Sequence, residues 1–257
     1  MLDQLITKRR LLAQGVALLL LPLLSAMAQA AEYPAQLDWS GRVTLTLPVS
    51  GVLNHLAAQA GQTVKQGELL ATLEPSLFKA GVAEARADMD RLSQEQADAN
   101  ADLQRVQELY ARTVTSTTEL DAAKLRFARA NSVLAAAQAR LERARRLLVE
   151  AELRAPFDAL ILQRHAEPGL VISSQCQPAP VFTVARADEL IARALLTPTQ
   201  VAAVRLGGEA EVVLGEVSQP GKIKAVTSSG EQRYSLEVSI LRSAGLYAGQ
   251  PASIRLP

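Results

Sequence analysis

The sequence is poor in residue types that several kinds of protein require. Its single cysteine, Cys176, excludes an intramolecular disulfide. Aromatic residues make up only 4% of the chain, which is too few for the base-stacking surfaces of proteins that bind single-stranded nucleic acid. The formal net charge is +1, so the chain exerts no strong electrostatic attraction on nucleic acid. We therefore expect no nucleic-acid partner.

Sequence patterns of catalysis and metal binding are also missing. The chain has no phosphate-binding glycine loop, no nucleophile elbow and no pair of catalytic carboxylates. His55 and His165 stand in apolar contexts typical of strands, without a cysteine or acidic cluster beside them, so we expect them to pack rather than bind metal. Cys176 has no evident catalytic partner and is expected to be a free thiol in a loop. The sequence predicts a protein that is not an enzyme, with no cofactor and no metal site.

Residues 1–30 have the pattern of a secretory signal peptide. Basic residues at 8–10 precede an apolar run at 16–24, and a small-residue cleavage pattern follows at 28–30. The apolar run is short for a membrane span, although an uncleaved anchor is the alternative. We expect cleavage after Ala30 and a mature protein in the periplasm of a Gram-negative bacterium.

The strongest pattern in the chain is a repeat of apolar residues between positions 77 and 151. Steps of three and four residues separate these positions, which is typical of a coiled-coil seam. The seam positions are Val82, Ala85, Met89, Leu92, Gln96, Ala99, Leu103, Val106 and Tyr110 in the first arm, and Leu120, Ala123, Phe127, Ala130, Leu134, Ala137, Leu141, Ala144, Leu148 and Ala151 in the second. If the arms fold back about residue 115, the numbers of facing residues add to a nearly constant value. Residues 76–150 are therefore predicted to form an antiparallel helical hairpin with arms about 50 Å long.

Short strand-like segments flank the hairpin. Those in residues 41–75 and 151–186 are predicted to be two halves of one β-sandwich that the hairpin interrupts. Residues 187–257 are predicted to form a small antiparallel β-barrel, with a short helix from Thr197 to Val204, and residues 31–40 an irregular lead. The predicted fold class is α+β and multidomain: an antiparallel α-helical coiled-coil hairpin inserted in a β-sandwich, followed by a barrel.

Three motifs lie within these parts. The first is the segment 48–52 followed by 61–70, the second is the segment 153–158 followed by Pro168-Gly169, and the third is Arg105, Leu109 and Ser116. Their sequences and order resemble those of the periplasmic adaptor proteins, or membrane fusion proteins, of tripartite efflux pumps. The first two motifs are similar to the halves of that family's lipoyl-like domain, except that Ala159 stands where the family usually has glycine. The third has the spacing of the family's tip motif.

The resemblance implies a set of partners. Arg105, Leu109 and Ser116 would dock onto an outer-membrane channel, and the barrel would face an inner-membrane transporter, for which a resistance-nodulation-division (RND) pump is favoured over an ATP-driven (ABC) exporter. Self-association, as a hexamer, is also implied. The chain ends at Pro257 without the further membrane-proximal domain that RND-type members usually carry, so a short-form or truncated adaptor is expected. Because the chain has only three methionines, copper or silver export is disfavoured.

Other interpretations exist for these residues. Ser116 with Glu119 is expected to form a capping box for the second arm, which would explain the serine without docking. Lys65 lies in a lipoyl-like sequence, so a lipoyl- or biotin-type carrier module of an enzyme complex is one alternative function. Carrier domains place their lysine on the turn where this chain has its hairpin, so Lys65 is expected to be an ordinary surface lysine. A periplasmic coiled-coil scaffold or chaperone is the other alternative.

Overall fold

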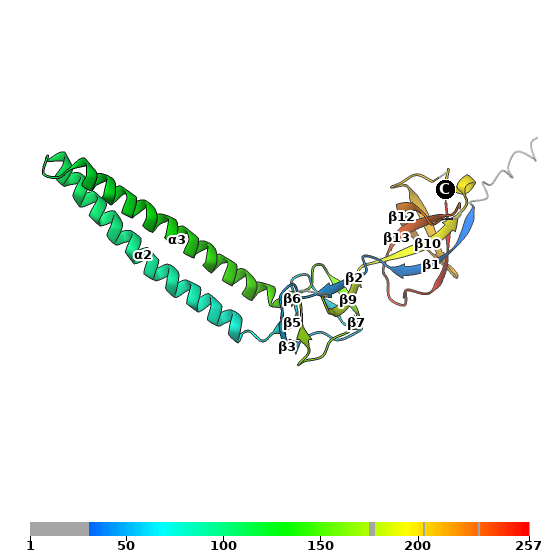
Figure 1. Ribbon diagram of the computed structural model, residues 1–257. Coiled ribbons are helices and arrows are strands. Elements are labelled where there is room, and N and C mark those ends of the chain that lie inside the picture. Colours follow the sequence, from blue (N-terminus) through cyan, green and yellow to red (C-terminus); the bar gives the residue numbers. More distant parts are fainter. Residues whose placement is uncertain (1–30, 175–177, 203, 231, 257) are drawn as a thin grey trace, which may run out of the picture. The chain divides into compact units, whose positions relative to one another are not determined.

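The computed structural model describes residues 31–174, 178–202, 204–230 and 232–256 (Figure 1). The predicted signal peptide, its cleavage site after Ala30, and Cys176 lie outside the described residues. The chain divides into two compact units. One is Trp39–Glu189, and the other combines the residues before Trp39 with those from Leu190 onward.

The first unit contains a β-sandwich to which both predicted halves contribute. One sheet has the strand order β2 (Val43–Thr46), β9 (Pro180–Arg186), β7 (Ala159–Arg164) and β4 (Thr63–Val64). The other has the order β6 (Glu152–Arg154), β5 (Leu69–Leu73), β3 (Gly51–Leu56) and β8 (Val171–Ile172). Each sheet therefore joins strands from before the hairpin to strands from after it, so neither half can form the domain alone.

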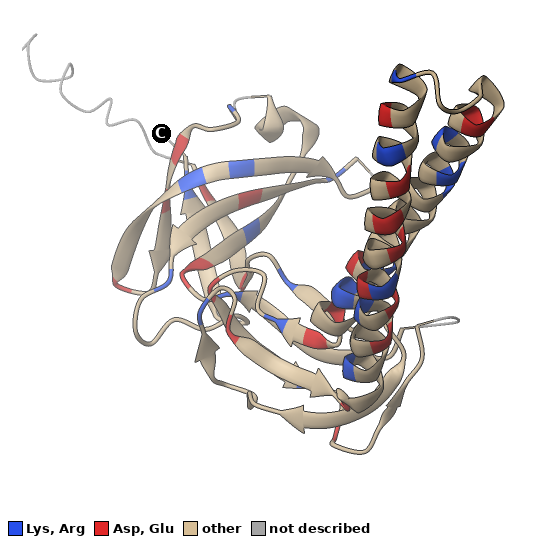
Figure 2. Ribbon diagram, turned by 90° about the vertical axis from the view of Figure 1, so that its left-hand side faces the viewer, with Lys and Arg blue, Asp and Glu red and all other residues tan. Residues whose placement is uncertain are grey.

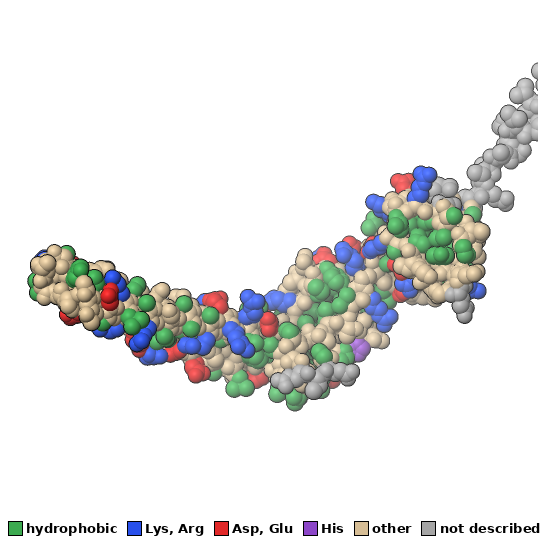
Figure 3. Space-filling view, turned by 45° about the horizontal axis from the view of Figure 1, so that its top comes forward, with side chains coloured by type: hydrophobic (Ala, Val, Ile, Leu, Met, Phe, Trp, Pro, Cys, Tyr) green, Lys and Arg blue, Asp and Glu red, His purple; other side chains and the backbone are tan. Residues whose placement is uncertain are grey.

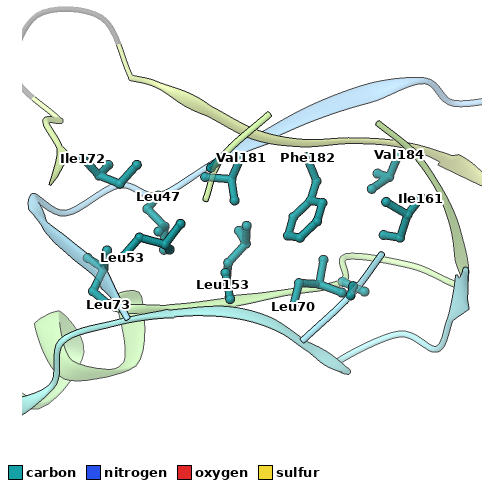
Figure 4. Packing of buried hydrophobic residues seen from close by; sticks show 14 of the residues in the cluster. Leu47, Leu53, Leu70, Leu73, Leu153, Ile161, Ile172, Val181, Phe182 and Val184 are labelled. Atoms are coloured by element: carbon teal, nitrogen blue, oxygen red, sulfur yellow. The ribbon is translucent and has the colours of Figure 1, made fainter. Parts of the chain in front are cut away.

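Aliphatic side chains from both sheets fill the sandwich. Phe182 is fully buried near the middle of this cluster, with Leu70 and Leu153 on the opposite side (Figure 4). The cluster extends to Ala151 and Phe78 at the base of the hairpin and includes no residue between positions 79 and 150. The hairpin consequently has a separate hydrophobic seam of its own.

Helices α2 (Ser76–Ala111) and α3 (Thr117–Glu150) form the hairpin. At 1.5 Å per residue each helix is about 50 Å long. Asp88 pairs with Arg140 at 2.8 Å and Asp102 with Arg126 at 2.7 Å, and the two ion pairs are separated by the same number of residues in both helices. This equal spacing confirms the predicted antiparallel register.

Burial along the hairpin follows the predicted seam. Every predicted seam position is buried or half-buried except Tyr110, which is 39% exposed. The most buried side chains are Leu92 and Val106 in α2 and Ala123, Ala137 and Leu141 in α3. Acidic and basic residues are interspersed along both helices (Figure 2). The hairpin is thus amphipathic, with charged faces that solvent can reach.

The second unit is a closed antiparallel barrel. Its strand order is β1 (Glu32–Trp39), β10 (Glu189–Leu196), β13 (Tyr234–Leu241), β12 (Val217–Ser228), β11 (Glu209–Leu214) and β14 (Pro251–Arg255). The short helix α4 (Pro198–Val201) follows β10 and ends before the predicted Val204. The side chain of Gln200 accepts a hydrogen bond from the Thr197 backbone N–H at 2.8 Å, as a capping box requires.

The structure corrects the prediction that residues 31–40 are an irregular lead. They form strand β1, which pairs with β14 and closes the barrel. Tyr33, Ala35 and Leu37 turn toward the interior, and Leu37 is only 1% exposed. Pro34 obscured this alternation, because proline has no N–H to donate to the ladder and therefore usually argues against a strand.

Strand β12 begins earlier than predicted, at Val217 rather than near Lys222. Pro220 and Gly221 lie inside it, although such residues usually mark a turn. A Cβ atom at Gly221 would lie 2.5 Å from Cγ1 of Val238, so the glycine allows close packing within the barrel.

Despite these local corrections, the predicted fold class of a helical hairpin inserted in a β-sandwich and followed by a β-barrel is confirmed. No helix among the described residues is long and apolar enough to cross a membrane.

Candidate docking tip of the hairpin

The C-terminus of α2 ends in a Schellman motif. The backbone N–H of Thr113 donates to Tyr110 O at 2.9 Å, and the N–H of Val114 donates to Leu109 O, also at 2.9 Å. Thr113 has a φ of 56°, the left-handed conformation that this motif requires and that glycine normally supplies. A β-branched residue is strained there, because its Cβ crowds the following carbonyl.

The N-terminus of α3 is capped by Ser116. Its hydroxyl accepts a hydrogen bond from the Glu119 backbone N–H at 3.3 Å, which is the serine half of the predicted capping box. The Glu119 carboxylate accepts a hydrogen bond from the Thr115 hydroxyl. Ser116 thus fixes the start of α3, and its side chain is exposed.

Arg105 lies in α2 fewer than two turns before the helix ends. Its guanidinium forms an ion pair with one carboxylate oxygen of Asp102. The other oxygen accepts a hydrogen bond from Nη2 of Arg126 in α3 at 2.7 Å. Hydrogen bonds from Arg126 and Arg105, in that order of effect, lower the pKa of Asp102. The side chain of Arg105 is 71% exposed, so this network holds a cation in place without covering it.

Apolar side chains are exposed at the same end of the hairpin. Leu109 is 37% exposed, in agreement with the expectation from its position beside the seam, and Tyr110 is 39% exposed. Val114, in the turn itself, is 69% exposed. The motif spacing did not identify Val114, although an apolar residue in an otherwise hydroxyl-rich turn is a detectable signal. Arg105, Leu109, Val114 and Ser116 therefore lie at the same end of the hairpin. Figure 3 shows hydrophobic side chains among the charged ones along the hairpin surface.

Lys65 has a structural partner in the second sandwich motif. Its ammonium group is 2.9 Å from a carboxylate oxygen of Asp158, and the other oxygen accepts the Gln66 backbone N–H at 2.9 Å. The Gln66 hydrogen bond and then the Lys65 hydrogen bond lower the pKa of Asp158, and the same contact raises the pKa of Lys65. Lys65 is 79% exposed, so it is a surface lysine whose ion pair ties the β4–β5 turn to the segment before β7.

The two histidines differ in their surroundings. The prediction that His55 packs is wrong, because its side chain is exposed on strand β3. His165 is exposed as well, so the prediction that it packs is also wrong, although its Nε2 lies 2.8 Å from the hydroxyl of buried Thr183 in the sandwich. No cluster of three or more metal-ligating side chains occurs among the described residues.

The comparison with protein families decides the classification. Residues 42–186, which span both sandwich halves and the hairpin, match the model of the CzcB-like barrel-sandwich hybrid domain. The chain belongs to this family. No curated protein matches the CzcB-like chain in sequence. The resemblance to membrane fusion proteins is thereby confirmed at the level of family.

Solved structures share the fold of this CzcB-like protein at low sequence identity. The membrane fusion protein Spr0693 from Streptococcus pneumoniae R6 is 13% identical, with a TM-score of 0.69 over 88% of this chain and 98% of its own. A MacA–MexA chimeric protein with the α-hairpin domain of Pseudomonas aeruginosa MexA is 21% identical, with a TM-score of 0.68 over 87% of this chain and 79% of its own. MacA from Actinobacillus actinomycetemcomitans is 18% identical, with a TM-score of 0.56 over 88% and 78% of the two chains. At these identities the likeness establishes the fold alone.

Proposed function

We propose that this protein is a non-catalytic periplasmic adaptor of a tripartite efflux system. It links an inner-membrane transporter, favoured to be of the RND type, to an outer-membrane channel that the hairpin tip contacts. Self-association, as a hexamer, completes the assembly. The observation that carries the proposal is the end of the hairpin, where apolar Leu109 and the cation of Arg105 are exposed within two turns of each other.

The architecture supports this function in two ways. Both helix ends at the tip are fixed by hydrogen bonds, so the exposed groups are held in place before a partner arrives. A preorganised surface loses less conformational freedom on binding than a flexible one does. The helices of 36 and 34 residues also carry the tip far from the β-sandwich, so a partner can contact the tip without contacting the sandwich.

The carrier-module alternative has less support. In a carrier the modified lysine would stand on the turn that joins the two sandwich halves, whereas here β5 runs into α2 and α3 runs into β6. Lys65, on another turn, forms an ion pair with Asp158. Intact-mass measurement tests this alternative, because a lipoyl or biotinyl group adds mass to the mature chain and the adaptor function requires none.

A cross-linking experiment in the source bacterium tests the proposal. Cys176 is the single cysteine in the sequence, so Cys176→Ser provides a background in which Thr113→Cys is the unique thiol. A photoactivatable maleimide attached at position 113 is expected to capture an outer-membrane channel, identified by mass spectrometry. The matched control is Val133→Cys, on the stem of the hairpin, by which we mean the parts of α2 and α3 away from the tip. Val133 is 47% exposed. Capture of assorted periplasmic proteins from position 113 would support the scaffold alternative instead.

A further inference from the structure

The turn at the hairpin tip holds one apolar side chain outward. In a Schellman motif the residue after the left-handed position commonly packs on the residue three places before the C-cap. Those two residues are Val114 and Leu109, whose backbones are joined by the 2.9 Å hydrogen bond. Even so, Val114 is 69% exposed and Leu109 37% exposed. The described chain therefore leaves much of this apolar pair uncovered.

Thr113, the residue before Val114, has a strained backbone conformation. Thr113 holds a φ of 56°, which a glycine would adopt without steric cost. Its hydroxyl donates to Arg112 O at 2.7 Å. On the other side of Val114, Ser116 caps the N-terminus of α3 and so fixes the chain there. Strained conformations persist where the surrounding structure determines them, and they occur preferentially at binding sites. The position of Val114 is thus set by the fold on both sides.

Charge at the tip differs from charge on the stem. Between positions 106 and 118 the charged residues are Glu108 and Arg112, and the rest of the turn carries hydroxyl groups. Farther from the turn, ion pairs join the two helices, such as those of Asp102 with Arg126 and of Asp88 with Arg140. A partner that fits this tip needs an apolar pocket for Val114 and hydrogen-bond acceptors around it for the guanidinium of Arg112 and the hydroxyls.

We infer that Val114 is the central contact of the docking tip and inserts into an apolar pocket of the outer-membrane channel. Acceptor oxygens at the rim of the pocket receive Arg112. Thr113 serves as a positioning residue that aims Val114 at the pocket. This inference rests on the proposed function, since it specifies which side chain makes the contact that the adaptor requires.

Binding measurements with matched variants test the inference. The probe is the outer-membrane channel captured through position 113, purified in detergent, and its affinity for the mature protein is measured by titration. Val114→Ala removes two methyl groups from the buried contact, and the expected loss of affinity is roughly tenfold. Val114→Asp is expected to abolish binding. The control Val133→Ala makes the same change on the stem, at a side chain 47% exposed, and is expected to leave affinity unchanged.

The outcomes separate this inference from the proposed function. If Leu109→Asp abolishes binding while Val114→Ala and Val114→Asp bind as tightly as wild type, the inference is overturned and the adaptor function stands. If no channel is captured either from position 113 or from a labelled cysteine at exposed Gln107 near the end of α2, both are overturned. Thr113→Pro, whose ring fixes φ near −65° and so cannot keep the left-handed turn, tests the positioning role: weaker binding with wild-type helix content supports it, whereas unchanged binding removes it.

Discussion

Truncation of a seam leucine should loosen the hairpin and leave the sandwich intact. Leu92 in α2 is 5% exposed, and the register places it opposite Ala137, which is fully buried. Leu92→Ala therefore removes a buried side chain from a narrow part of the seam. Buried Leu→Ala substitutions cost about 2–5 kcal/mol. Because only two helices surround the site and can move together, we expect a value at the lower end, about 2–3 kcal/mol.

Native-state hydrogen exchange measures this loss region by region. A loss of about 2–3 kcal/mol corresponds to roughly 30- to 150-fold faster exchange of hairpin amides that open with the seam. Amides near Phe182 should exchange at the wild-type rate, because the sandwich cluster contains no residue between positions 79 and 150. The control is Leu125→Ala, which makes the same change in a helix at a side chain 52% exposed. Its expected cost is below about 0.5 kcal/mol.

Two results would refute this reasoning. Equal acceleration by Leu92→Ala and Leu125→Ala would mean that the seam does not hold the helices together. Acceleration of the sandwich amides along with the hairpin amides would mean that the two parts unfold as one cooperative unit.

The remaining predictions concern the barrel, the start of α2 and the sandwich. Gly221→Ala places a Cβ 2.5 Å from Cγ1 of Val238, so thermal denaturation should show a barrel destabilised by about 1–3 kcal/mol. Gly81→Ala meets no atom within 4 Å in a helix and should raise the stability of the hairpin by up to about 1 kcal/mol in the same assay. The Asp158 pKa is lowered by Gln66 and Lys65, so its contribution to stability is full above about pH 4 and is lost as the pH falls through the lowered folded value. The difference in Tm between wild type and Asp158→Asn should therefore be present at pH 7 and vanish in strong acid; a pH-independent difference would contradict this assignment.

Much of the fold could be predicted because the hairpin is a local, repetitive structure. Its seam depends on spacing within each arm, and the antiparallel register follows once the turn near residue 115 is placed. Strand β1 was missed for the opposite reason. Its partner β14 lies at the far end of the chain, and with Pro34 inside it, only that long-range pairing reveals residues 32–39 as a strand.

The candidate tip was predictable in part. The spacing of Arg105, Leu109 and Ser116 indicates the end of the hairpin, and seam geometry indicates that Leu109 is half exposed. Val114 could not be identified in the same way, because its exposure depends on the left-handed φ of Thr113, a residue type that rarely adopts it.

Drug susceptibility of the source bacterium tests the central claim, docking through the hairpin tip, most directly. Cells that lack the chromosomal copy are complemented with wild type, Leu109→Asp or the stem control Leu125→Asp, and protein level and helix content are checked for each. Leu109→Asp is predicted to leave cells as susceptible as those without the protein, and Leu125→Asp to restore resistance. Full resistance with Leu109→Asp at wild-type protein level would contradict docking through this tip.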